Sequence, residues 1–220
     1  AEVVVIGSDV AKYRSGATLP DSETIDVPRG GTVRVLLVSG RTEVLKGPKT
    51  IAVKELGKGE ARDESLFRQI VGMVRPAAST TEQPGAVRPA APTSDLPASF
   101  SWKDVPVDAD GDYCVERGAS LSLTRRSSRG DQKLTLVDVA AAKRVDVEFR
   151  SGERAAPWPK EMPPKIANYA LIGSSGPMRT LRLRLISPLP GKDQALRVLH
   201  GQKCAVQMEA LVRAMADPKY

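Results

Sequence analysis

The sequence is poor in the residues that most catalytic and metal sites require. It contains one histidine, His200, and two cysteines, Cys114 and Cys204, among 220 residues. These three side chains cannot form a four-ligand zinc site without carboxylates, and no Cys-x-x-Cys pair occurs. A P-loop, a Gly-x-Gly-x-x-Gly turn and a Gly-x-Ser-x-Gly elbow are also missing. We therefore expect no catalytic residues, no metal and no cofactor, and we predict that the protein is not an enzyme.

Long apolar stretches are absent as well. No apolar run exceeds four residues, as in Val35–Val38, whereas a membrane-spanning helix needs about 20. We expect a protein that does not span a membrane. The chain begins Ala-Glu-Val, as a mature protein does after removal of a signal peptide. This start predicts a periplasmic or secreted protein, and in such a compartment the cysteine pair predicts a disulfide bond between Cys114 and Cys204.

Aromatic residues make up only 4% of the chain, so its cores must consist mainly of Val, Leu, Ile and Ala. Short Val-rich segments separated by turn residues favour strands and a mainly β fold. Residues 1–75 predict a small β-domain followed by an amphipathic helix over 63–74, with Asp63 as its N-cap. The strands expected in this domain cover residues 2–6, 24–27, 32–38, 42–46 and 50–56.

The segment 76–98 contains five prolines among Ala, Ser, Thr and Gly, which predicts a linker. Residues 99–220 predict a second, antiparallel β-sheet domain of the β-sandwich kind, with one or two C-terminal helices linked to it by the disulfide bond. The expected strands cover 113–117, 120–125, 133–139, 144–150, 168–173 and 178–186, and the expected helices cover 192–199 and 204–216.

The first quarter of the chain carries a recognisable pattern. It comprises Tyr-Arg-Ser-Gly-Ala-Thr-Leu at 13–19, the segment 25–37 around Arg29-Gly30-Gly31, and the segment 39–48 that ends in Gly-Pro. Over residues 1–56 the pattern resembles the FecR-like domain of bacterial envelope proteins. The resemblance implies a small periplasmic or secreted β-structure that serves protein–protein contacts, with no catalytic residues to carry over. Residues 99–220 resemble no family that we recognise.

The chain carries 33 basic and 26 acidic side chains, a formal net charge of +7, which favours an acidic partner. The candidate ligand surface consists of Trp102, Trp158, Arg179, Arg182 and Arg184. Each tryptophan is compatible with two interpretations: a stacking platform for sugars, or a large ring at the edge of the core.

The alternating acids at 108–112 allow two readings as well. Their spacing does not match a calcium loop, so an acidic turn is predicted.

The leading functional prediction is an exported protein-interaction, scaffold or signal-relay module whose partner is another envelope protein. The alternative is a module that binds cell wall or acidic glycan, and a cryptic hydrolase is third. Nucleic acid is not expected, because no basic helix or stacking motif is present.

Overall fold

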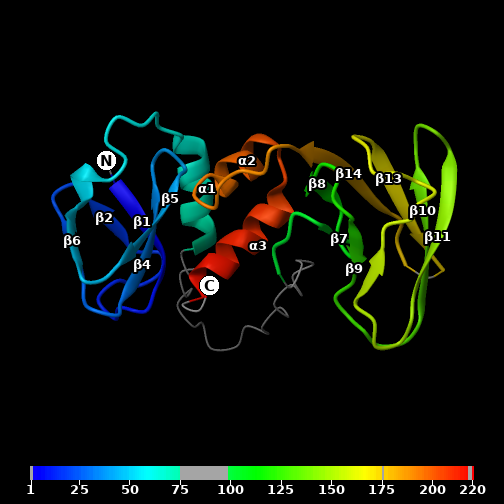
Figure 1. Cartoon of the computed structure of the whole chain (residues 1–220), viewed down its shortest axis with the longest axis horizontal. Coiled ribbons are helices and arrows are strands. Elements are labelled where there is room, and N and C mark those ends of the chain that lie inside the picture. Colours follow the sequence, from blue (N-terminus) through cyan, green and yellow to red (C-terminus); the bar gives the residue numbers. More distant parts are fainter. Residues whose placement is uncertain (1, 75–98, 175, 218–219) are drawn as a thin grey trace, which may run out of the picture. The chain divides into compact units, whose positions relative to one another are not determined.

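A computed structural model of the chain describes residues 2–74, 99–174, 176–217 and 220. The chain forms two compact units. Unit 1 comprises Ala1–Thr93, Pro190–Val198 and Leu211–Tyr220, and unit 2 comprises Ser94–Leu189 and Leu199–Ala210. Figure 1 shows the elements of both units in sequence colours. The predicted mainly β fold is confirmed, whereas the predicted linker over 76–98 lies outside the described residues.

Unit 1 is built from two small sheets. Its strands are β1 (Glu2–Ser8), β2 (Thr18–Pro20), β3 (Thr24–Val27), β4 (Thr32–Leu37), β5 (Thr42–Lys46) and β6 (Lys49–Ala52). A four-stranded antiparallel sheet has the order β2-β1-β4-β5, and β3 pairs with β6. A 3₁₀ helix (Val53–Glu55) and α1 (Glu64–Val74) follow. Residues 53–56, expected as strand, therefore leave the sheet after Ala52, and Val53 and Leu56 are buried in the core of the unit.

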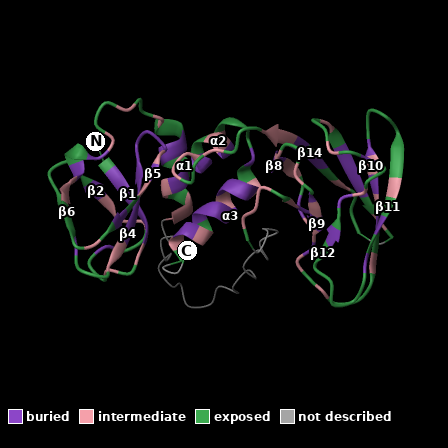
Figure 2. Cartoon of the chain, in the orientation of Figure 1, coloured by how far each residue is buried: buried purple, intermediate pink, exposed green. Residues whose placement is uncertain are grey.

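The central strands of unit 1 are buried on both faces. Alternate residues such as Val3 and Val5 enter the core between the two sheets, and Val4 and Leu36 on the other face are equally inaccessible (Figure 2). A Cβ on Gly7 would lie 2.4 Å from the Met215 carbonyl oxygen, so β1 approaches the end of α3 (Ala205–Ala216) closely. The apolar residues of this strand thus have a layer to pack against on either side.

Helix α1 forms where the sequence predicts it. The Leu66 N–H donates to the Asp63 carboxylate over 3.0 Å, which confirms Asp63 as the N-cap. Its apolar residues Leu66, Phe67 and Ile70 are buried. The helix therefore packs its apolar face into the protein and leaves its polar face in water.

Unit 2 is a β-sandwich. Its strands are β7 (Asp104–Pro106), β8 (Gly111–Glu116), β9 (Ser122–Thr124), β10 (Gln132–Asp138), β11 (Lys143–Phe149), β12 (Ala155–Pro157), β13 (Asn168–Gly173) and β14 (Arg179–Ile186). A five-stranded sheet, β11-β10-β13-β14-β8, and a three-stranded sheet, β12-β9-β7, enclose one core. The β14–β8 and β7–β9 pairings are parallel, unlike the antiparallel sheet expected. The short strands β2, β7 and β12 were not expected, since each ends in proline.

The C-terminal helices are α2 (Ala195–Gly201) and α3. Contacts assign Pro190–Val198 and Leu211–Tyr220 to unit 1, whereas the sequence placed all of 99–220 in the second domain. Met208 and Ala210 are buried in the part of α3 that belongs to unit 2, and Leu211, Val212 and Met215 are buried in the part that belongs to unit 1. None of the helices in the described part of the chain combines the length and apolar character of a membrane span.

Candidate interaction surface

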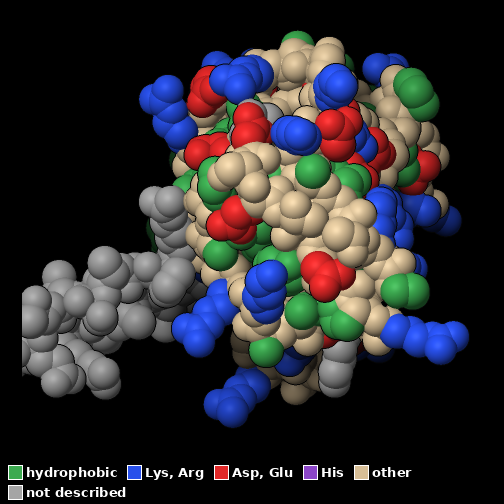
Figure 3. Space-filling view, turned by 90° about the vertical axis from the view of Figure 1, so that its left-hand side faces the viewer, with side chains coloured by type: hydrophobic (Ala, Val, Ile, Leu, Met, Phe, Trp, Pro, Cys, Tyr) green, Lys and Arg blue, Asp and Glu red, His purple; other side chains and the backbone are tan. Residues whose placement is uncertain are grey.

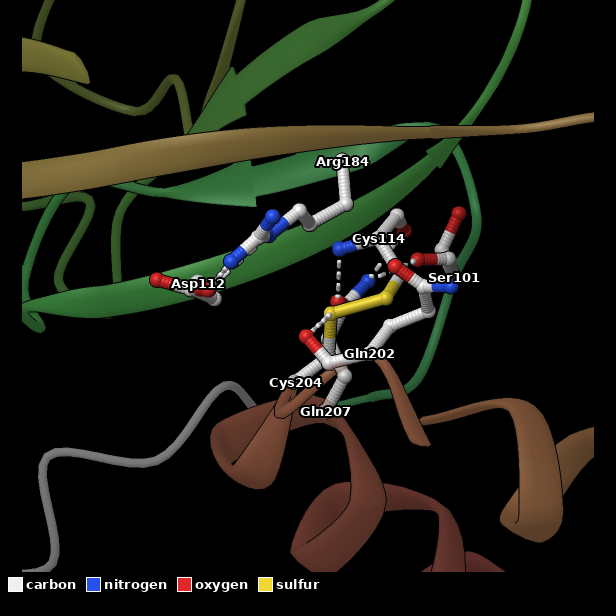
Figure 4. Close-up of a disulfide and its surroundings, with 7 residues drawn as sticks. All are labelled: Ser101, Asp112, Cys114, Arg184, Gln202, Cys204 and Gln207. Atoms are coloured by element: carbon white, nitrogen blue, oxygen red, sulfur yellow. Dashed lines mark hydrogen bonds and ion pairs between the residues drawn. A yellow bond between two sulfur atoms is a disulfide. The ribbon is translucent and has the colours of Figure 1, made fainter. Parts of the chain in front are cut away.

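The predicted disulfide bond is present. Cys114 on β8 is bonded to Cys204, directly before α3, with Cα atoms 5.9 Å apart. Figure 4 shows Gln207 of α3 beside this bond. The Gln207 Oε1 accepts the Cys114 N–H at 2.6 Å, and the Gln207 Nε2 donates to the Cys114 carbonyl at 2.8 Å. Because Cys204 is half of a disulfide, it cannot act as a nucleophile with His200.

The two tryptophans do not form a sugar-binding platform together. Trp158 is only 6% exposed, its Nε1–H donates to the Met162 carbonyl, and its ring packs edge-on against Tyr169. It belongs to the core of unit 2, the second of the two interpretations. Trp102 is half-buried and packs edge-on against Phe100. A buried ring has no free face for a sugar, so Trp158 is removed from the candidate surface.

The arginines of β14 are mostly engaged by the acidic turn at 108–112. Arg179 pairs with Asp110 at 3.2 Å, and the Arg184 Nε and Nη2 both bond one oxygen of Asp112, at 3.0 and 2.8 Å. The Thr180 N–H, together with Arg179, lowers the pKa of the Asp110 carboxyl below its usual value. Only Arg182 of the three arginines is exposed. Asp110 and Asp112 therefore orient neighbouring arginine side chains and a main-chain amide. Within the described ranges, no group of three His, Cys, Asp or Glu side chains could hold a metal ion.

A second surface, which the sequence did not single out, lies on unit 1. It is a groove of about 700 Å³ along the edge strand β5, here called the β5 groove. Its walls include Arg34, Val44, Lys46, Lys192, Met215 and Tyr220, all of unit 1. Val44 is 48% exposed and Tyr220 is 49% exposed, so two large apolar side chains face water in the same groove. Exposed apolar side chains gathered in a concave surface are typical of binding sites.

The charges of the β5 groove are unbalanced. Four basic side chains (Arg34, Arg41, Lys46 and Lys192) and two acidic ones (Glu43 and Asp193) line it. Arg41 is paired with Glu60 and Glu43. Lys46 and Lys192 have no ion pair within the described residues. Elsewhere on unit 1, Figure 3 shows a face on which Lys and Arg are interspersed with Asp and Glu.

One wall of the groove is fixed by a buried arginine. The Arg34 guanidinium, on β4, donates to the main-chain oxygens of Met215, Asp217 and Tyr220 over 2.7–3.0 Å. The Met215 oxygen lies in the last turn of α3 and the other two oxygens follow it, where carbonyls lack helical partners and a cation is favourable. The Tyr220 ring also lies 5.5 Å from the guanidinium. Arg34 thus holds the end of α3 against the sheet and places Met215 and Tyr220 beside Val44.

One signal for this site was present in the sequence. Arg34 is the only charged residue in the otherwise apolar segment 33–38, and a charge in a buried strand needs a buried partner. The partner, however, is the backbone of a helix end about 180 residues away. Spacing within the sequence does not reveal such a contact.

No family model, curated protein or solved structure matches the chain. The functional interpretation therefore depends on the residues and geometry of the two units.

Proposed function

We propose that this chain is an exported bacterial envelope protein that binds another envelope protein through the β5 groove and catalyses no reaction. The proposal rests on the juxtaposition of exposed Val44 and Tyr220 with two lysines, Lys46 and Lys192, that have no ion pair to any described residue. An apolar centre with a charged rim is the usual anatomy of a protein–protein interface. In such an interface a few buried side chains supply most of the binding energy.

Two further observations support export. The Cys114–Cys204 disulfide is of a kind that persists in oxidising compartments such as the periplasm. The resemblance of residues 1–56 to FecR-like domains suggests the same location and a role in protein contacts. The glycan alternative has lost Trp158 to the core and two of its three arginines to ion pairs. The hydrolase alternative is not favoured by any contact described above.

The proposal predicts that Val44→Asp weakens partner binding. We expect the immobilised full chain to retain a stoichiometric protein from a bacterial envelope fraction, and the variant to bind it at least about 30-fold more weakly. A carboxylate would have to be desolvated at the centre of the interface, and loss of such a contact costs about 2 kcal/mol or more. The measurement is a titration of the retained protein on the immobilised chain, with identification by mass spectrometry.

Ile172→Asp is the matched control. Ile172 is a similarly exposed aliphatic residue, at 39%, on β13 of unit 2. We expect this variant to bind like the unaltered chain. Retention of wall polymer with no protein would contradict the proposal and favour the glycan alternative. Equal losses of binding for both variants would contradict a role of the β5 groove.

A further inference from the structure

Several edge strands of the sheets in the two units are protected, in different ways, from pairing with another chain. An edge strand presents unpaired N–H and C=O groups that invite pairing with another chain, and folded proteins usually block them. Three edge strands end in proline, which has no N–H to donate: β2 in Pro20, β7 in Pro106 and β12 in Pro157. These edges cannot extend into a regular ladder.

Other edges are covered or charged. On β8, the Gln207 side chain bonds both main-chain groups of Cys114, and the Trp102 carbonyl accepts the Glu116 N–H. In the two-stranded sheet, the Tyr13 hydroxyl accepts the Asp26 N–H. Strand β11 carries exposed charges at alternate positions: Arg144, Asp146 and Glu148. Like β8, these edges are poor templates for an added strand.

Strand β5 differs from these edges. The Leu37 N–H donates to the Arg41 carbonyl and the Gly47 N–H to the Gly31 carbonyl, which fixes the hydrogen-bonding phase of the β4–β5 ladder. In that phase the main-chain groups of Glu43 and Leu45 face β4. Those of Thr42, Val44 and Lys46 face outward, because successive residues of a strand alternate. The edge therefore presents a row of outward-facing main-chain N–H and C=O groups beside the β5 groove.

The first position of this row is already occupied. The Thr42 N–H donates to the Asp193 carbonyl at 2.9 Å, so an irregular segment of the same unit makes one bond to the edge and then departs. In the described part of the chain, no main-chain bond is recorded on the outward side of Val44 or Lys46. The N–H and C=O groups of these two residues are left facing the groove.

We propose that an extended acidic segment of the partner protein adds to β5 as a strand, pairing with Val44 and Lys46. This inference rests on the proposed protein-binding function and specifies its binding mode. Main-chain bonds to Val44 and Lys46 provide the pairing, and Val44 and Tyr220 contact apolar side chains of the added strand. Lys46 and Lys192 favour acidic residues, because basic side chains outnumber acidic ones in the groove and neither lysine has an ion pair among the described residues.

The test uses synthetic peptides and the full chain. The first probe is a blocked heptapeptide alternating glutamate and valine, the second is the same peptide N-methylated at alternate residues, and the third replaces glutamate by lysine. Binding is followed by amide chemical shifts and by hydrogen exchange at Val44 and Lys46. We expect the acidic peptide to protect both amides, and N-methylation to weaken its binding on the order of tenfold through the loss of main-chain hydrogen bonds.

Val44→Pro is the matched protein variant. It removes an N–H that faces outward and replaces the valine side chain by another apolar one, while the β4–β5 ladder keeps its bonds. The acidic peptide should therefore bind on the order of tenfold more weakly. The N-methylated peptide tests the same bonds without altering the protein, should this variant not fold. Absence of binding by the acidic peptide would overturn strand addition, and so would binding of the N-methylated or the lysine peptide as tight as that of the acidic one.

The proposed function is judged separately. Retention of an envelope protein that depends on Val44, without peptide binding, leaves that function intact and overturns only the binding mode. Failure to retain any envelope protein overturns the function as well.

Discussion

Replacing both Cys114 and Cys204 by alanine is expected to lower the free energy of unfolding of unit 2 by about 4 kcal/mol. The bond closes a loop between residues 90 positions apart, and a loop of that length costs the unfolded chain much of its conformational freedom when it is cross-linked. Alanine adds no buried hydroxyl group, but it also removes the two buried sulfur atoms, which reduction of the unaltered chain leaves in place. The measurement is urea unfolding of the double variant and of the unaltered chain.

Two observations check the assignment. Thiol titration of the denatured, non-reduced protein should find no reactive cysteine, since the described residues contain no free one. Reduction of the unaltered chain should reproduce the effect of the double variant. A loss below about 1 kcal/mol would mean that the bond does not constrain the unfolded chain as the loop estimate requires.

Gly47→Ala is expected to destabilise unit 1 by about 3 kcal/mol. A Cβ at this position would lie 1.7 Å from the Pro28 carbonyl oxygen, a backbone atom that cannot rotate away. The segment after β3 and the segment after β5 touch here, and the Gly47 N–H also donates to the Gly31 carbonyl at 2.9 Å. Overpacking of this kind must displace the backbone. Chemical or thermal unfolding followed by circular dichroism measures the change.

Gly72→Ala is the matched control for the same substitution. Gly72 lies in α1, and nothing would lie within 4 Å of its added Cβ. Alanine is the better helix former, so we expect a stabilisation of about 0.5–1 kcal/mol. Similar effects for the two substitutions would show that the backbone contact at Gly47 is not restrictive.

Much of the secondary structure follows from short-range patterns. Strands β3, β5 and β13 have the bounds that alternation and turn residues predicted, and Asp63 begins α1 as expected. The disulfide bond follows from the number of cysteines and an assumed compartment. Such features depend on neighbouring residues or on simple counts, which a single sequence displays directly.

The features that the sequence did not reveal depend on contacts between distant segments of the chain. The parallel pairing of β14 with β8 joins segments about 70 residues apart, and no periodicity distinguishes it from an antiparallel one. Trp158 lies between two prolines, which favours an exposed loop, yet Tyr169 and Met162 enclose it. The β5 groove needs Arg34, Val44 and Tyr220 from three places in the chain. Its existence depends on tertiary contacts that local patterns do not encode.

The position of Gln207 has a consequence for how the protein must be produced and stored. Its carboxamide occupies the outer side of β8 as a neighbouring strand would, and the disulfide bond holds it there by tethering the start of α3 to Cys114. Reductant would free that helix end and leave the main-chain groups of Cys114 open to another molecule. Preparations kept reduced should form oligomers on light scattering at concentrations where oxidised preparations remain dispersed. The redox state of the sample thus determines whether the protein forms oligomers, in addition to its folding equilibrium.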